Sequence, residues 1–308
     1  MSLTVTGMAR RLPSLRDRLA RDLADIERQL QALLDISGIR YINPNRGDSG
    51  VWVVGASDYG WAPSDDAQQL ARMKLTRDYE AWYSRFRTLF GGITPELKKS
   101  IGKADEFTRH WITRSGGYDH TIPRTITEAK VVAVKRMAPL REGLELLGLQ
   151  GEGGLRVVPD TSALMDQPAL ADYSTVVGAK TFTVHLLPQV LVELDALKDG
   201  GRTQEQQKRA RAALRGIKDL KQRGELTKGV KLTRGITVIA DPREPDFTKL
   251  PDWLNPQVPD DRVLAGALEV QATHPSSVVV LVASDLNLQN KAEVVGLPSV
   301  EPPTKPDA

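Results

Sequence analysis

The chain has 308 residues, 40 % of them hydrophobic and 26 % charged, and carries a formal net charge of +3. This length predicts two domains, and the composition excludes a disordered chain and a membrane-embedded one. The sequence contains no cysteine, which excludes disulfides, thiol catalysis and sulfur-ligated zinc. Because the amino terminus does not have the pattern of a signal peptide, we expect a cytoplasmic protein.

The first half of the chain is predicted to be mostly helical. Apolar residues at helical spacing predict helices over 9–35 and 66–90. Between these helices, the short β-like runs at 38–42 and 51–56 flank a polar stretch, 43–50, and predict a small hairpin. The aromatic residues of the second helix repeat at helical spacing, so we expect them to form a core rather than a platform for stacking bases.

Two further helix starts are visible in this half. Thr94 followed by Pro95 predicts an N-cap with proline at the first helical position. The segment 125–128, Thr-Ile-Thr-Glu, predicts a capping box for a helix that Pro139 is expected to break or bend. Residues 1–147 therefore form a mostly helical domain, and they carry no catalytic motif that would assign it a role.

The second half has a different pattern. A glycine-rich segment, 148–154, is predicted to link the domains, and the tail 301–308 is predicted to be frayed. Within 155–300, continuous apolar runs alternate with amphipathic segments, which predicts an α/β domain whose parallel sheet is covered by helices on both faces. The runs predicted as strands are LRVV, FTVHLL, ITVIA and VVVLVA. The four predicted helices of this domain are 188–198, 203–222, 260–272 and 286–295.

Acidic residues recur where the predicted strands end or the next helix begins. In a parallel α/β sheet such positions meet at one edge, so we expect these carboxylates to cluster. Clustered carboxylates repel one another and are normally tolerated because a divalent cation binds them. Oxygen ligands without a nearby His or Cys favour Mg²⁺ or Mn²⁺ over zinc. The acidic positions are Asp160, Glu193, Asp260, Asp261 and Asp285.

Basic residues are concentrated in a different segment. Residues 198–234 contain twelve Lys and Arg against four Asp and Glu, counted along the sequence. Within the predicted helix 203–222, four of the basic residues fall on one stripe, where they can neutralise successive phosphates of a nucleic acid. A solvated helix face is the alternative that the sequence leaves open. The stripe consists of Lys208, Arg211, Arg215 and Lys218. His185 lies in an apolar run and is predicted to be a structural histidine rather than a metal ligand.

At four of these places the sequence resembles the PIN-domain nucleases. The segments that carry the resemblance are VVPDTSALMD, LVELDALK, PDDRVLAGAL and VVLVASDLNLQNKAEVVGL, in the order of the family. The last two segments are similar to those of the PIN domains of endoribonucleases that act in messenger-RNA decay. The resemblance covers about 155–300 and does not extend to residues 1–147.

The resemblance implies a role for each matched position. Asp160, Glu193, Asp261 and Asp285 match the family's catalytic acids and would hold one or two Mg²⁺ or Mn²⁺ ions. In the family, two residues separate this acid from an aliphatic residue followed by a small one. Leu264 and Ala265 fit the last two positions, so the spacing selects Asp261, with Asp260 as its neighbour. The resemblance also implies supporting polar groups at Ser162, Ser284 and Asn287. The implied activity is metal-dependent hydrolysis of RNA, with single-stranded RNA as the expected partner and a homodimer as an expected assembly.

Other functions fit the sequence less well. A toxin-like PIN ribonuclease would be a single compact domain, and a flap nuclease would carry further helical DNA-binding elements. A phosphoryl-accepting receiver or a phosphatase requires its acidic pair early, whereas here the pair comes late. A scaffold that binds RNA or protein through residues 1–147 stays open, because those residues carry 23 basic and 18 acidic side chains within 1–150.

Overall fold

The structure is a computed structural model that describes residues 12–42, 59–114, 122–149 and 153–304. The chain forms two compact units. The helical unit comprises 18–86 and 93–147, and the sheet unit comprises 1–17, 87–92 and 148–308. No helix in the described ranges is long and apolar enough to cross a membrane.

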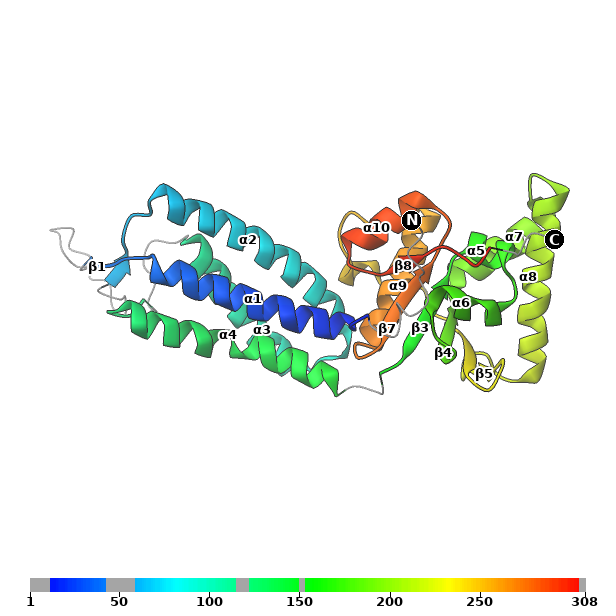
Figure 1. Cartoon of the computed structure of the whole chain (residues 1–308), viewed down its shortest axis with the longest axis horizontal. Helices are drawn as coiled ribbons and strands as arrows, with labels where there is room; N and C mark the ends of the chain where they lie inside the picture. Colours follow the sequence, from blue (N-terminus) through cyan, green and yellow to red (C-terminus); the bar gives the residue numbers. More distant parts are fainter. Residues whose placement is uncertain (1–11, 43–58, 115–121, 150–152, 305–308) are drawn as a thin grey trace. The chain divides into compact units, whose positions relative to one another are not determined.

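The helical unit is built from long amphipathic helices and one short hairpin (Figure 1). Helices α1 and α2 bury their apolar faces, and Trp82 of α2 and Trp111 of α3 are almost completely inaccessible to solvent. The aromatic residues of α2 thus form a core, as their spacing predicts. The elements are α1 (Leu15–Asp35), β1 (Ile39–Tyr41), β2 (Tyr59–Trp61), α2 (Asp66–Arg87), α3 (Pro95–Thr113) and α4 (Ile126–Gly148).

The predicted caps of this unit are present. The Thr94 side chain accepts a hydrogen bond from the backbone N–H of Leu97. Thr125 and Glu128 form the reciprocal capping box, because each side chain accepts from the other residue's backbone N–H. Of the two outcomes predicted for Pro139, a break does not occur: α4 continues through it, with Met137 and Leu140 buried on either side. Tertiary packing of this apolar face outweighs the lost backbone hydrogen bond.

The hairpin is found, although its second strand differs from the prediction. Strand β1 pairs antiparallel with β2, from Ile39 opposite Trp61 to Tyr41 opposite Tyr59. The apolar run at 51–56, predicted as the second strand, lies outside the described residues, and so do 150–152 of the predicted linker and 305–308 of the predicted tail. A two-stranded sheet this short depends on the helices it packs against for its stability.

The sheet unit contains one six-stranded sheet in the order β5-β6-β4-β3-β7-β8. All neighbouring pairs are parallel except β5 and β6. The central strands are continuous apolar runs buried on both faces, which is the pattern that predicted a parallel sheet. The strands are β3 (Leu155–Pro159), β4 (Phe182–Leu186), β5 (Val230–Lys231), β6 (Ile236–Ala240), β7 (Val278–Val282) and β8 (Ser299–Val300).

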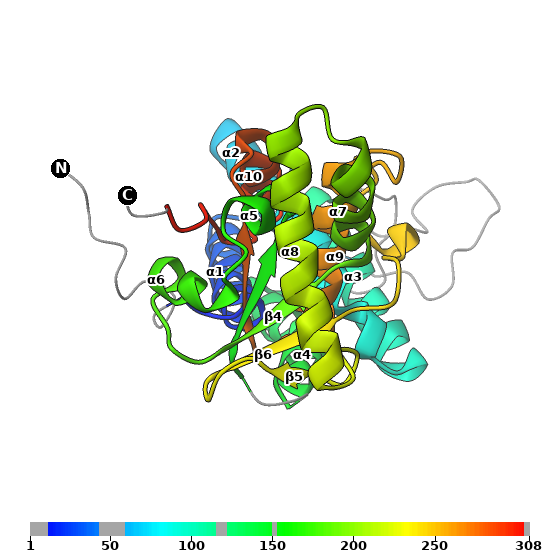
Figure 2. The ribbon, with the colours of Figure 1, turned by 90° about the vertical axis from the view of Figure 1, so that its right-hand side faces the viewer.

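Helices cover the two faces of this sheet in two groups. The connections from β3 to β4 and from β4 to β6 place the intervening helices on one face, and the return to β7 and β8 places α9 and α10 on the other, as the general right-handed rule for such crossovers requires. Figure 2 shows α8 in front of β4 and β6, with α7 beside it. The helices are α5 (Thr161–Asp166), α6 (Tyr173–Val177), α7 (Pro188–Gly200), α8 (Gln204–Arg223), α9 (Pro259–Thr273) and α10 (Leu286–Val294).

Candidate active site

The candidate site lies at the carboxyl ends of the central strands. Asp160 directly follows β3, and Asp285 follows β7, which is the parallel neighbour of β3. A backbone hydrogen bond of 2.9 Å from the N–H of Asp160 to the carbonyl of Val282 ties these two strand ends together. The first turns of α9 begin at the same edge because α9 runs antiparallel to the strands. The topology therefore brings the acids of separate segments to one end of the sheet.

Asp160 is the most desolvated carboxylate of this group that lacks a cationic partner. It caps α5: one carboxylate oxygen accepts from the N–H of Ala163 at 2.6 Å and the other from the hydroxyl of Ser162 at 2.8 Å. Its exposed fraction is 5 %. The pKa of Asp160 is raised to about 6, chiefly by burial and also by the nearby carboxylates of Asp260 and Glu193, against the lowering effect of its hydrogen bonds.

Glu193 is oriented from two directions. It lies in α7, where Gln189, one turn earlier, donates its amide to Glu193 at 2.5 Å. The hydroxyl of Thr161, next to Asp160 in the chain, donates to the other oxygen of Glu193. The first turn of α5 and the second turn of α7 thus hold the carboxylates of Asp160 and Glu193 in fixed relation.

Asp261 is buried in α9 with an exposed fraction of 3 % and has a cationic partner. The ammonium of Lys291, on α10, donates to Oδ1 of Asp261 at 2.6 Å. The backbone N–H of Asn255 donates to Oδ2 at 2.9 Å. Both oxygens of Asp261 are therefore engaged within the protein.

Asp260 precedes Asp261 and is more accessible. Burial raises its pKa, and the carboxylates of Asp285, Glu193 and Asp261 add to that effect while Lys291 opposes it. Asp260 thus interacts electrostatically with every other acid of the group, including Asp160. The prediction that Asp261 is the ligand and Asp260 its neighbour stays a prediction.

Asp285 caps α10 by accepting from the N–H of Leu288 at 2.8 Å, and its side chain is exposed. Of the supporting groups predicted from the resemblance, Ser162 contacts its acid directly. Ser284 and Asn287 are exposed, and neither makes a side-chain hydrogen bond within the described part of the chain. Their supporting role stays a prediction.

The oxygen donors of these acids fit a hard divalent cation, although their side chains do not converge on one common position. The acids provide only oxygen donors, and burial together with the neighbouring carboxylates raises the pKa values of Asp160 and Asp260. Among the residues that the structure describes, no three acidic or histidine side chains are close enough to hold a metal ion. Binding of a cation would thus require the carboxylates to move inward, against their mutual repulsion.

The basic stripe of α8 lines a groove. The groove has a volume of about 600 Å³ and lies along α8, with Lys198 of α7 on its other side. Arg211 pairs with Asp199 at 3.3 Å, and Lys198 pairs with Asp195 at 2.6 Å. The remaining predicted cations of the stripe have no ion-pair partner within the described segments. The charged and polar lining consists of Lys198, Gln204, Gln207, Lys208, Arg211, Arg215 and Lys218.

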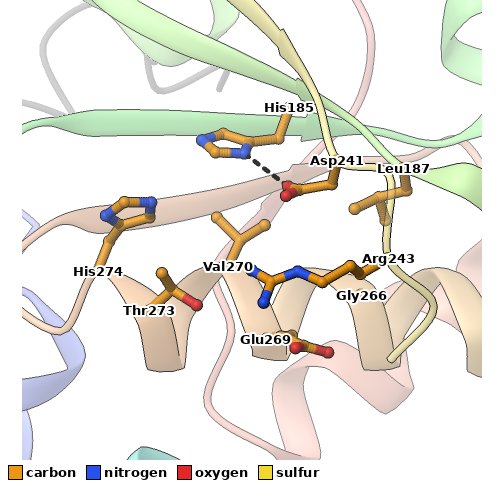
Figure 3. A pocket seen from close by; sticks show the side chains of 9 residues that line it. All are labelled: His185, Leu187, Asp241, Arg243, Gly266, Glu269, Val270, Thr273 and His274. Atoms are coloured by element: carbon orange, nitrogen blue, oxygen red, sulfur yellow. Dashed lines mark hydrogen bonds and ion pairs between the residues drawn. The ribbon is translucent and has the colours of Figure 1, made fainter. Parts of the chain in front are cut away.

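His185 has a structural arrangement, shown in Figure 3. Nη1 of Arg156 lies 3.0 Å from Nε2 of His185, and Oδ2 of Asp241 lies 3.1 Å from Nδ1. Because a guanidinium only donates, Nε2 must accept, and Nδ1 carries the proton that it donates to Asp241. Both ring nitrogens are therefore occupied within the protein, as predicted for a structural histidine. The ring borders a cavity of about 40 Å³, where His274 also lies.

A parallel sheet with acids gathered at its carboxyl edge defines the class of α/β domains that carry a carboxylate site. Residues 157–302 match the family model of the PIN domain. The C-terminal half of this chain is therefore a PIN domain, which is a nuclease-type fold. No curated protein matches the chain.

Several residues at this edge were not predicted from the sequence. Thr161, Gln189, Asn255 and Lys291 each contact one of the acids. The spacing of Gln189 and Glu193, four residues apart on a helix, is a local pattern that would have identified one of these contacts. The others join segments that are distant in the sequence or lie in an irregular loop, so no local pattern indicates them. Tyr173 belongs with them: its buried hydroxyl has no partner in the described structure, and burial, together with the charge of Asp160, raises its pKa.

Proposed function

We propose that the chain is a divalent-metal-dependent endoribonuclease whose site is the carboxylate group of Asp160, Glu193, Asp261 and Asp285. The observation that supports this proposal most directly is the electrostatic coupling of these acids with Asp260 at the carboxyl edge of a PIN-domain sheet. A fold stabilised without a ligand has no need of acids placed so that burial and neighbouring carboxylates raise the pKa values of Asp160 and Asp260.

In this proposal each acid has a distinct task. Asp160, Asp261 and Asp285 would hold Mg²⁺ or Mn²⁺, with Glu193 as a further ligand. When bound, the cation supplies an activated water and neutralises charge on the scissile phosphate. Ser162 and the N–H of Ala163 fix the rotamer of Asp160, and Thr161 and Gln189 fix that of Glu193. Prior orientation of these oxygens reduces the reorganisation needed when substrate arrives.

The groove along α8 supports RNA as the substrate. Lys208, Arg211, Arg215 and Lys218 recur every three or four residues, so successive cations are ~5 Å apart along the helix axis. Such a row can follow the phosphates of a single strand, and Gln204 and Gln207 at one end add amide donors and acceptors. Helix α8 packs against α5 and α7, which carry or adjoin two of the proposed catalytic acids.

Cleavage of end-labelled single-stranded RNA by the purified full chain tests the proposal. We expect cutting in Mn²⁺ or Mg²⁺, none in EDTA, and a loss of at least ~100-fold for Asp261→Asn, because catalysis by bound metal needs all its ligands. Asp195→Asn, which changes an exposed acid on α7, is the matched control and should cut like the wild type. A DNA strand of the same sequence tests the preference for RNA.

Two outcomes would contradict the proposal. Cleavage by the chain that survives both EDTA and Asp261→Asn would not depend on the proposed metal site. Preparations that cut no RNA under any metal would leave the acids as a structural cluster and direct attention to residues 1–147 as a scaffold.

A further inference from the structure

The carboxylate group contains one cation of its own. Lys291 extends from α10, and its ammonium lies 2.6 Å from Oδ1 of Asp261. It also acts on Asp260, where its charge opposes the effect of the neighbouring carboxylates. Lys291 is the only cation for which the described structure shows an ion pair with one of these acids.

The environment of this ion pair differs from that of a surface pair. The side chain of Asp261 is 5 % exposed and that of Lys291 is 25 % exposed, so the attraction is only weakly screened by solvent. A buried carboxylate that loses its cationic partner is strongly destabilising, because an uncompensated charge stays behind. Lys291 therefore compensates the buried charge of Asp261, whereas the described structure shows no ion pair for Asp160, whose pKa is raised chiefly by burial.

The pair also constrains how a metal ion can reach Asp261. Oδ1 accepts from Lys291, and Oδ2 accepts from the N–H of Asn255. A divalent cation at Asp261 must share or take over Oδ1 from the ammonium, since the backbone N–H of Asn255 belongs to the loop that precedes α9 and cannot rotate away like a side chain. The ammonium and the incoming cation also repel each other.

We propose that Lys291 is a positioning residue that acts as a resident cation of the site: it holds Asp261 in place without metal and competes with the divalent cation for that carboxylate. This inference rests on the proposed function, because it requires that a metal binds there. It predicts that loss of the lysine charge has opposite effects on two measurable properties. The metal-free fold becomes less stable, and the affinity for metal becomes higher.

Mn²⁺ binding and thermal unfolding of the full chain test this inference together. For Lys291→Met we expect a lower Tm in EDTA and a Kd for Mn²⁺ that falls by roughly tenfold, because one positive charge near the ion is removed. Lys291→Arg keeps the charge and should stay close to the wild type in both measurements. Lys228→Met, which removes an exposed lysine from a surface pair, is the matched control and should change neither.

A double-mutant cycle separates this role from ordinary packing. In an Asp261→Asn background the Lys291→Met substitution should no longer lower the Tm in EDTA, because the carboxylate that needs the ammonium is gone. If Lys291→Met does not fold in EDTA, Mn²⁺ should restore the fold, and failure to do so overturns the inference.

The outcomes also distinguish this inference from the proposed function. Unchanged or weaker Mn²⁺ binding by Lys291→Met, with normal binding by the wild type, overturns the inference and leaves the nuclease proposal standing. A wild-type chain that binds no Mn²⁺ overturns both.

Discussion

At the scale of single residues, the ionised carboxylate of Asp160 destabilises the folded protein. The carboxylate is almost fully buried, has hydrogen-bond donors but no cation, and faces other acids. Its pKa in the folded protein, about 6, is higher than its ordinary value of 3.8. The folded state therefore binds a proton more tightly than the unfolded state does, and the ionised form is destabilising.

This difference sets the direction of a pH effect. At a pH below 3.8 the carboxyl is protonated in both states and costs nothing. Between 3.8 and about 6 stability falls as the pH rises, and above 6 the full penalty is present. This rise in pKa, from 3.8 to about 6, corresponds to a penalty on the order of 2–3 kcal/mol.

We therefore predict that Asp160→Asn stabilises the metal-free protein at pH 7.5 by up to ~2–3 kcal/mol while it abolishes cleavage. Asparagine can still accept from the N–H of Ala163, so the cap of α5 is kept. Urea unfolding in EDTA at pH 4.5 and 7.5 measures the effect: the gain should be larger at the higher pH. A variant that is less stable at both values would show that the hydrogen bonds of Asp160 outweigh its desolvation.

At the scale of elements, α8 determines how the chain would hold a polyanion. Lys208 and Lys218 lie at the two ends of its basic stripe, and neither has an ion-pair partner in the described structure. Replacing both by Gln should weaken binding of single-stranded RNA and reduce the slope of log Kd against log salt concentration by ~1.4, because each phosphate contact on a single strand contributes ~0.7.

Fluorescence anisotropy in the Asp261→Asn background measures this binding without cleavage. The matched control, Lys221→Gln with Lys231→Gln, removes the same charge from exposed positions outside the groove. Equal slopes for the two double variants would mean that the effect follows net charge alone and that the groove is a solvated face.

The elements also show how far a sequence can be interpreted. Strands β3, β4, β6 and β7 and the long helices were predicted, because continuous apolar runs and capping residues are local patterns. Strands β5 and β8 have two residues each, too few for any periodicity to appear, and they were not predicted. The break expected at Pro139 failed because a local rule gave way to tertiary packing.

The candidate site shows the same difference between features with a local sequence pattern and features that depend on tertiary packing. The acids at strand ends could be predicted, since topology alone brings strand ends together. The sequence could not indicate that Asp261 is buried against Lys291 while Asp260 faces the other acids, because both facts depend on how α10 packs against α9. Neither could it indicate that Thr161 orients Glu193 across 32 positions of sequence.

At the scale of the whole molecule, the carboxylate group and the tryptophan core belong to different units. Every acid of the site lies in the sheet unit, whereas Trp82 and Trp111 are buried in the helical unit. The sheet unit contains Trp253, which is 46 % exposed. Changes in the emission of buried tryptophan therefore report mainly on the helical unit.

This separation allows metal binding to be located by unfolding. Mg²⁺ at about 100 times its Kd should stabilise the unit that binds it by ~2.7 kcal/mol. We expect amide hydrogen exchange to slow in β3, α7 and α9 of the sheet unit, while the Trp82 and Trp111 transition keeps its midpoint. In Asp261→Asn the slowing should disappear, since a ligand is lost. Equal stabilisation of both units would show that they unfold as one cooperative body, and no stabilisation of either would mean that the folded carboxylates do not bind the cation.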